Sequence, residues 1–218
     1  MVQKSATGGL PAADIYGITA GEYSLGRSNV EVVRQMIAAG IRIIQYREKD
    51  KTLGEKYHEC QQIRAMTREA GVTFIVNDHV DLALLVGADG VHVGQDDLPP
   101  DKIRALAGDG MIIGMSTHSP AQARSAAAGG VDYIGVGPIF ATKTKRDVCD
   151  PVGLEYLDYV VNNLNIDFVA IGGIKEHNIH EVARRGARRI ALVTEIVGAA
   201  DITAKVRALR AAAGRKEV

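Results

Sequence analysis

Charged side chains follow a buried apolar stretch in the segment IRIIQYREKD, residues 41–50. Gln45, Arg47 and Lys49 stand at alternate positions, and alternate residues of an extended chain point to the same side. Two cations in a concave site require an anion, and phosphate oxygens suit both a guanidinium fork and an ammonium group. The spacing favours a phosphate site in which Gln45 reads a neutral ring. The alternative is a set of solvated loop charges, with Gln45 as a satisfied amide.

Two aspartates, Asp78 in VND and Asp97 in GQDD, follow the next two apolar segments. Neighbouring carboxylates resist joint ionisation unless a cation lies between them. Oxygen ligands without a histidine–cysteine set favour Mg2+, which keeps waters and takes further oxygens from substrate phosphates. The alternative is helix capping, by Asp78 before the helix that begins near Asp81 and by Asp96 or Asp97 before the helix after Pro99. Capping explains one aspartate more readily than two.

Polar residues also follow four later apolar segments, in STHS, ATKTKRD and GGI and at Thr194. The loop ATKTKRD carries Thr142, Lys143, Thr144 and Lys145, and it is a candidate lid over a phosphorylated ligand. Its alternative is an exposed basic loop. The glycine pair in GGI would let backbone N–H groups approach a phosphate.

Two histidines lie near these segments. His118, in STHS, is a candidate for proton transfer, although a lone histidine is a weak indication. His92 lies inside an apolar segment, and we expect a structural residue or a part of an inner wall.

Eight short apolar segments, each preceded or followed by an amphipathic stretch, must position these side chains. Strict alternation of strand and helix predicts a parallel sheet with right-handed crossovers. Eight units predict an α/β fold with a single (β/α)8 TIM barrel, whose site lies at the carboxyl ends of the strands. The alternative, an open doubly wound sheet, lacks a GxGxxG after its first strand. The expected strands are Ile15–Thr19, Ile41–Tyr46, Thr73–Val76, Gly90–Val93, Ile112–Met115, Tyr133–Val136, Phe168–Ile171 and Arg189–Val193, and expected helices include Thr52–Ala70, Pro120–Ala128 and His177–Arg185.

The bulk composition restricts the class of protein. The chain has 218 residues, 46% of them hydrophobic, and 26 basic residues balance 26 acidic ones. This neutrality argues against nucleic-acid or membrane partners reached through bulk charge. Without a secretory segment, a membrane-spanning run or paired cysteines, we expect a soluble cytoplasmic protein. We expect a flexible tail over residues 1–13 and a catalytic barrel over 14–218, and the sequence leaves a homo-oligomer open.

The motifs QYREKD, VNDHVDLAL, ADGVHVGQDD, GMSTHS, GVGPIFATKTK and AIGGI resemble, in order and spacing, the thiamine phosphate synthase family. The resemblance covers about residues 14 to 212. It implies a (β/α)8 barrel and a transferase that uses Mg2+. The substrates would be 4-amino-5-hydroxymethyl-2-methylpyrimidine diphosphate and 4-methyl-5-(2-phosphooxyethyl)thiazole, or its carboxylated form. The products would be thiamine phosphate and pyrophosphate.

The resemblance also assigns roles to residues. Gln45 and Asn77 would hold the aminopyrimidine, and Asp78 and Asp97 the magnesium. The other expected contacts are Arg47, Lys49, Ser116 and Lys145 with the pyrophosphate, Thr142 and Thr144 with the thiazole, and Gly173, Val193 and Thr194 with its phosphate. Their neighbours Tyr46, Glu48 and Lys143 complete the expected substrate-contacting set.

Two features depart from the resemblance or compete with it. Thr194 stands where the family commonly has serine, and Glu195 beside it would repel a phosphate if it pointed inward. The exposed surface is expected to include Arg184, Arg185, Arg188 and Arg189. Rival functions are a thiazole tautomerase-like isomerase using His118 without magnesium, and a sensor that binds thiamine precursors without turnover; a different phosphate-binding barrel, an epimerase or an indole-forming enzyme, is a further alternative.

Overall fold

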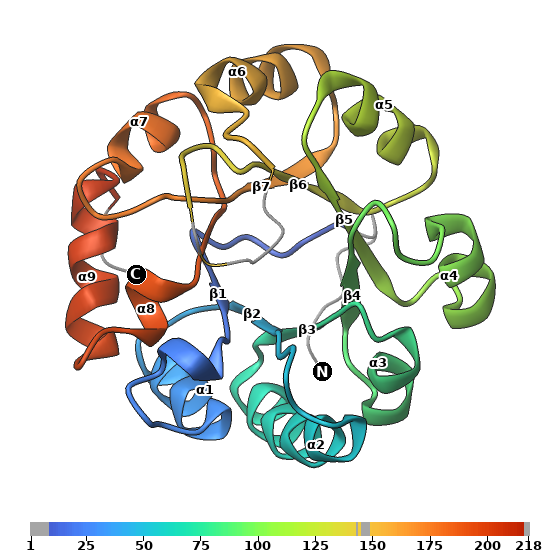
Figure 1. Cartoon of the computed structure of the whole chain (residues 1–218), viewed down its shortest axis with the longest axis vertical. Helices are drawn as coiled ribbons and strands as arrows, with labels where there is room; N and C mark the ends of the chain where they lie inside the picture. Colours follow the sequence, from blue (N-terminus) through green and yellow to red (C-terminus); the bar gives the residue numbers. More distant parts are fainter. Residues whose placement is uncertain (1–8, 143, 145–148, 216–218) are drawn as a thin grey trace.

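A closed barrel of eight parallel strands forms the centre of the protein in its computed structural model, which describes residues 9–142, 144 and 149–215. Each strand pairs with its sequence neighbours, and β8 pairs with β1 (Figure 1). The strands are β1 (Ile15–Ile18), β2 (Ile43–Tyr46), β3 (Thr73–Asn77), β4 (Gly90–Val93), β5 (Ile112–Thr117), β6 (Tyr133–Val136), β7 (Asp167–Ala170) and β8 (Ile190–Leu192). The predicted (β/α)8 barrel is confirmed, and no strand end differs from its prediction by more than two residues.

Helices surround the barrel on its outer face (Figure 1). They are α1 (Asn29–Ala38), α2 (Leu53–Ala70), α3 (Val80–Val86), α4 (Pro100–Ala107), α5 (Pro120–Ala128), α6 (Gly153–Asn163), α7 (Ile179–Arg184), α8 (Thr194–Val197) and α9 (Ile202–Ala212), and a 3-10 turn, η1 (Gly21–Tyr23), follows β1. None of the helices in the described ranges has the length and apolar character needed to span a bilayer.

Local signals explain where the longest helix begins and ends. Thr52 and Glu55 form a reciprocal capping box at the start of α2, which satisfies backbone N–H groups that have no partner inside the helix. Gly71 closes α2 with a left-handed φ of 64°, a conformation that costs glycine little. The helix therefore stops where β3 must begin.

Two apolar cores lie on opposite faces of the sheet. The outer core packs strand residues such as Ile44 and Val76 against the helices, and the inner core fills the barrel with Tyr16, Ile43 and Tyr133 among others. Adjacent strand residues therefore divide between the two cores, as the pleat requires. Beyond the carboxyl end of each strand, the residues at the same alternate positions as the inward-facing ones must lie at the mouth of the barrel.

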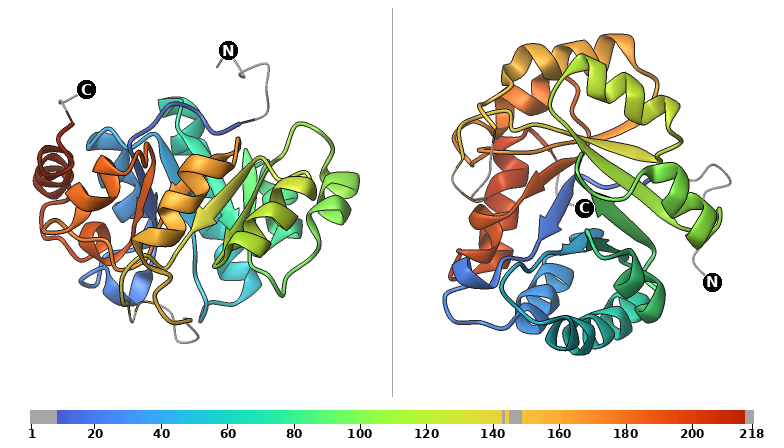
Figure 2. Two further views of the ribbon diagram at one scale, coloured as in Figure 1. Left: turned by 90° about the horizontal axis from the view of Figure 1, so that it is seen from above. Right: turned by 45° about the vertical axis from the view of Figure 1, so that its right-hand side comes forward.

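The N-terminal segment closes the other end of the barrel. Leu10 is only 5% exposed and packs in the inner core, and Arg189 donates to the carbonyl oxygens of Leu10 and Pro11. Leu10 and Pro11 thus belong to the barrel floor, and residues 1–8 of the expected flexible tail lie outside the described residues. Arg189 also pairs with Asp167 at 3.0 Å, so its prediction as exposed surface charge was wrong. The described residues that follow β6, up to position 142, lie at the opposite end (Figure 2).

Candidate active site

Two adjoining cavities of about 1080 and 700 Å³ open at the carboxyl ends of the strands. The first is lined by Gln45, Arg47, Asn77, Ser116, His118, Thr142, Thr144, Gly173, Val193 and Thr194, among others. The second is lined by Arg47, Glu48, Lys49, Asn77, Asp78, Asp97, Ser116 and Thr144, among others. Residues that are far apart in the sequence therefore meet at one end of the barrel. Lys143 and Lys145 lie outside the described residues.

Arg47 lies on the boundary between the two cavities. Its backbone N–H donates to Thr19 Oγ1 at 2.9 Å, and Thr19 Oγ1 donates back to the Arg47 carbonyl, which anchors the residue at the end of β2. Its guanidinium has no hydrogen-bond or ion-pair partner among the described residues, and Nε is buried. A buried guanidinium nitrogen without a partner is costly unless a ligand supplies an acceptor.

Lys49 and Asp78 face each other across the second cavity. Lys49 Nζ lies 2.6 Å from Asp78 Oδ2. Asp78 adopts a φ of 63°, which is unusual for a residue other than glycine, and its N–H donates to the His92 carbonyl. That bond fastens the β3 exit to β4 and directs the carboxylate toward the mouth of the barrel.

Neither predicted metal ligand caps a helix. His79 is the N-cap of α3 and Pro99 that of α4, and neither helix has a side-chain cap. Asp97 Oδ2 instead accepts from the N–H of Gly94 at 2.7 Å, which closes the β4–α4 turn. The capping alternative for these aspartates is therefore wrong. Both side chains line the same cavity, and both offer the oxygen ligands that a hard cation requires.

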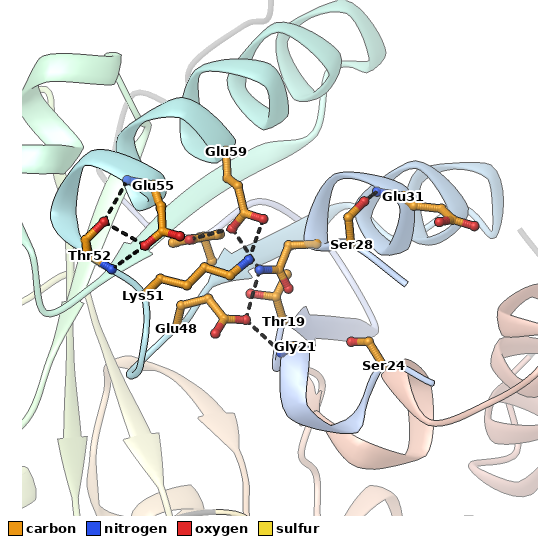
Figure 3. A network of polar contacts seen from close by, with 12 residues as sticks. Thr19, Gly21, Ser24, Ser28, Glu31, Glu48, Lys51, Thr52, Glu55 and Glu59 are labelled. Atoms are coloured by element: carbon orange, nitrogen blue, oxygen red, sulfur yellow. Dashed lines mark hydrogen bonds and ion pairs between the residues drawn. The ribbon is translucent and has the colours of Figure 1, made fainter. Parts of the chain in front are cut away.

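A polar cluster behind β2 holds the loop that carries Arg47 and Lys49. Glu48 Oε1 accepts from the N–H of Gly21 at 2.7 Å and from Asn29 Nδ2 at 2.9 Å, and Lys51 pairs with Glu59 (Figure 3). Although Glu48 lines the second cavity, its carboxylate is bound to the β1–α1 segment. Its contacts indicate a role in loop anchoring.

Tyr46 belongs to this cluster and faces the helices. It packs in the outer core, and its hydroxyl donates to Glu59 Oε2 at 2.7 Å. Burial and the adjacent Glu59 carboxylate raise the pKa of Tyr46. The Tyr46 side chain therefore lies on the opposite face of β2 from Gln45 and, unlike its expected role as a substrate contact would suggest, lines neither of the two cavities.

A chain of hydrogen bonds crosses the barrel interior beneath the first cavity. Gln45 Nε2 donates to Tyr16 Oη at 2.9 Å, and the hydroxyls of Tyr16 and Tyr133 lie 3.0 Å apart. His92 Nδ1 lies 2.9 Å from Tyr133 Oη, and His92 Nε2 lies 2.9 Å from Ser116 Oγ. Sequence reasoning placed His92 on the inner wall, as the structure has it, but it missed both tyrosines. Both tyrosines occupy positions of β1 and β6 that point into the barrel, and this alternation along the strands could have identified them.

The β7 exit is fastened to the loop that follows β6. Gly173 has a φ of 64°, and a Cβ there would lie 2.6 Å from the carbonyl oxygens of Phe140 and Ala141. Asn178, which sequence reasoning missed, donates to the Gly173 carbonyl at 3.1 Å and accepts from the N–H of Lys175. The glycine thus permits close approach of two backbones beside the cavity.

The hydroxyls of Thr142 and Thr144 lie 3.1 Å apart at the rim of the first cavity. Glu195, which would repel a phosphate if it pointed inward, is turned toward two ammonium groups. Its carboxylate lies 3.9 Å from Lys175 Nζ and 3.7 Å from Lys205 Nζ. The lysines offset its negative charge next to Thr194.

His118 is held by the backbone. The ring atom Nδ1 lies within hydrogen-bonding distance of the Gly137 carbonyl oxygen, and the backbone N–H of His118 donates to Gln122 Oε1. Because a carbonyl oxygen only accepts, Nδ1 carries a proton. The side chain lines the first cavity.

Comparisons with known proteins agree with this geometry. The family model described as thiamine monophosphate synthase matches residues 15–196. A thiamine-phosphate synthase of Pelotomaculum thermopropionicum is 75% identical over 100% of both chains. One of Lawsonia intracellularis is 57% identical over 92% of each.

Solved structures show the same relationship. A thiamine phosphate pyrophosphorylase from Pyrococcus furiosus is 34% identical, with a TM-score of 0.84 over 93% of this chain and 96% of that one. A 3-hexulose-6-phosphate synthase is 20% identical, with a TM-score of 0.61 over 90% of this chain and 99% of that one, which shows the fold alone. The family model and the closely similar relatives cover nearly all of the sequence, and the chain belongs to the thiamine-phosphate synthase family of transferases.

Proposed function

We propose that the protein joins 4-amino-5-hydroxymethyl-2-methylpyrimidine diphosphate to 4-methyl-5-(2-phosphooxyethyl)thiazole, or to its carboxylated form, and releases thiamine phosphate and pyrophosphate. The observation that carries this proposal is the Arg47 guanidinium, which lies unpartnered among the described residues between two cavities. Gln45 lines only the first of these cavities and Lys49 only the second, whereas Asn77, like Arg47, lines both. A ligand with a polar ring next to a diphosphate matches this order of groups.

The same geometry supports a bound Mg2+. Asp78 and Asp97 are the residues that would hold it, because both present carboxylate oxygens to the second cavity. The metal would supply charge neutralisation for the departing diphosphate. Lys49 is 57% exposed, so an exchange of its Asp78 partner for a diphosphate oxygen costs it little.

The chain's own residues would then favour a dissociative substitution. The bond between the pyrimidine methylene carbon and the diphosphate oxygen breaks, and its electron pair leaves with the diphosphate. The electron-rich ring stabilises the cation until the thiazole nitrogen donates an electron pair to the same carbon. Arg47, Lys49 and Ser116 would stabilise the negative charge as it develops, and Lys145 would act with them.

The thiazole would occupy the part of the first cavity near β6, β7 and β8. Thr142 and Thr144 present hydroxyls there, and Gly173, Val193 and Thr194 line the end suited to its phosphate. Holding both rings in one cavity raises their effective concentration, and enclosure limits capture of the cation by water. The balanced charge of the chain supports action on small molecules, without a nucleic-acid or membrane partner reached through bulk charge.

One assay tests the proposal. The purified protein is mixed with both substrates and Mg2+, and thiamine phosphate and pyrophosphate are followed over time. We expect equal amounts of both products and no product after addition of EDTA. Bound ligands without any product would favour the precursor sensor, and an isomerised thiazole would favour the tautomerase. Full turnover in EDTA would contradict the metal assignment.

A further inference from the structure

The orientation of the Gln45 amide implies a direction for the hydrogen-bond chain inside the barrel. Tyr16 Oη accepts a proton from Gln45 Nε2, so its own proton must go elsewhere. Tyr16 is 2% exposed, and the remaining polar neighbour of its hydroxyl in the described structure is Tyr133 Oη. A buried hydroxyl proton without an acceptor is costly, so Tyr16 donates to Tyr133.

The direction then propagates to His92. Tyr133 already accepts from Tyr16, so its proton goes to His92 Nδ1, 2.9 Å away. A neutral imidazole with an accepting Nδ1 carries its proton on Nε2. That proton is donated to Ser116 Oγ at 2.9 Å. Burial raises the pKa of both tyrosines, so the two hydroxyls keep the protons that the chain requires.

Both ends of the chain open to the first cavity. Gln45 uses its amide nitrogen inward, which leaves Oε1 to accept from a ligand. Ser116 Oγ accepts from His92, which leaves its hydroxyl proton to be donated to a ligand. The site therefore presents an acceptor at β2 and a neutral donor at β5. These groups fit a ring amino group and a diphosphate oxygen respectively.

The barrel makes room for this chain. A Cβ on Gly114 would lie 2.1 Å from the Tyr133 ring, and a Cβ on Gly135 would lie 3.4 Å from the His92 ring. Glycine at position 114 is therefore needed for Tyr133 to reach the barrel axis. The rings of His92 and Tyr133 have centroids 5.4 Å apart, so the two residues pack as well as bond.

We propose that Tyr133 is a positioning residue that acts through His92: it holds the Nε2–H tautomer and thereby makes Ser116 a hydrogen-bond donor to the leaving diphosphate. The proposal rests on the function proposed above. It differs from a purely structural role because it specifies a tautomer, which can be measured without substrate.

The first test reads the tautomer of the wild-type protein without substrate. Histidine is labelled with 15N in the full chain, and His92 is assigned by comparison with His92→Gln in long-range 1H–15N spectra. We expect His92 of the substrate-free protein to be protonated at Nε2. Protonation at Nδ1 would mean a reversed chain, with Ser116 donating to His92, and would overturn the proposal. This readout stands even if the protein forms no thiamine phosphate, so it separates the two proposals.

The second test compares two buried tyrosines. Tyr133→Phe removes the donor to His92, and Tyr156→Phe removes a hydroxyl that donates to Thr117 Oγ1 at 2.7 Å, outside the barrel interior. We expect Tyr133→Phe to mix the His92 tautomers and to lower kcat roughly tenfold, less than removal of a transition-state donor costs. The KM for the thiazole phosphate should stay unchanged. Tyr156→Phe should leave the tautomer and kcat unchanged. Equal behaviour of both variants would contradict the positioning role.

Discussion

Lys49 Nζ and Asp78 Oδ2 form a 2.6 Å ion pair across the second cavity. Lys49 is expected to bind the diphosphate, and its partner Asp78 is expected to bind the metal. The pair implies competition between Lys49 and Mg2+ for one carboxylate. Asp78→Asn keeps the shape of the side chain and removes its charge. We expect the Mg2+ concentration for half-maximal activity to rise roughly tenfold, as loss of an anionic ligand weakens metal binding. The measurement is the initial rate of pyrophosphate release against Mg2+.

Two further variants sharpen this experiment. Lys49→Gln removes the group that competes with Mg2+ for Asp78, so it should not raise the Mg2+ concentration for half-maximal activity. It should lower kcat, because Lys49 is expected to stabilise the departing diphosphate. Asp81→Asn changes an exposed carboxylate in the first turn of α3 and should alter neither. An unchanged Mg2+ requirement in Asp78→Asn would exclude Asp78 as a ligand.

Arg47 is predicted to contribute more than any other described cation, because its guanidinium lacks a protein partner among the described residues. Arg47→Gln should lower kcat/KM for the pyrimidine diphosphate by roughly 10²–10³-fold, as for loss of a transition-state donor. Arg47→Lys should recover only part of this loss, since an ammonium cannot form a forked contact. Arg124→Gln, at an exposed position of α5, is the control and should have wild-type kinetics. Wild-type kinetics in Arg47→Gln would remove Arg47 from the site.

Tyr46 is predicted to act on stability alone. Tyr46→Phe removes a partly buried hydrogen bond to the Glu59 carboxylate, so the free energy of unfolding should fall by about 1.5–3 kcal/mol. The kcat and both KM values should stay within about twofold of wild type, since the side chain faces away from the cavities. Urea denaturation and steady-state kinetics on the same preparations check both values. A large rise in KM with unchanged stability would restore Tyr46 as a substrate contact.

Asp14 should make stability depend on pH. Burial raises the pKa of Asp14, but hydrogen bonds from Arg210 and the Ile15 N–H, with the charges of Arg210 and Arg215, outweigh it and lower the pKa below 3.8. A depressed carboxyl pKa stabilises the fold above the ordinary pKa, and this contribution is lost as pH falls through the lowered one.

Asp14→Asn tests this linkage. Asp14 forms a two-point ion pair with Arg210 at 2.7 and 3.2 Å, so the variant should lose about 3 kcal/mol of unfolding free energy at pH 7. The gap between variant and wild type should narrow as pH falls below 3.8. Denaturant unfolding of both proteins at a series of pH values measures this difference in unfolding free energy. A gap that does not change with pH would contradict the assignment.

Gly173 is predicted to be irreplaceable by alanine. Its φ is 64°, and an added Cβ would lie 2.6 Å from two carbonyl oxygens of the β6–α6 segment. Gly173→Ala should cost at least about 1–2 kcal/mol of unfolding free energy and raise the KM for the thiazole phosphate. Gly54→Ala, in α2 with no atom near the added methyl, should stabilise by about 0.5 kcal/mol. Thermal melts and steady-state kinetics of both variants measure these changes. A Gly173→Ala variant with unchanged stability and an unchanged KM would contradict the prediction.

The sequence alone determined the barrel and the end of it that carries the site. Alternating strands and helices with glycine at helix ends admit few topologies, and in a parallel barrel every strand exit reaches one rim. Gln45, Arg47, Asp78 and Ser116 could therefore be placed together from their positions after strands. The order and spacing of the six motifs also indicated the family to which the chain belongs.

Only the tertiary structure decided how neighbouring side chains divide their roles. Tyr46 and Gln45 are adjacent in sequence, but the register of β2 sends one to the helices and the other into the barrel. Lys49 pairs with Asp78 across 29 positions, and Tyr16 meets Tyr133 across 117. Such contacts depend on distances between strands that no local pattern encodes. The hydrogen-bond chain and its direction exist only because the closed barrel brings five strands around one axis.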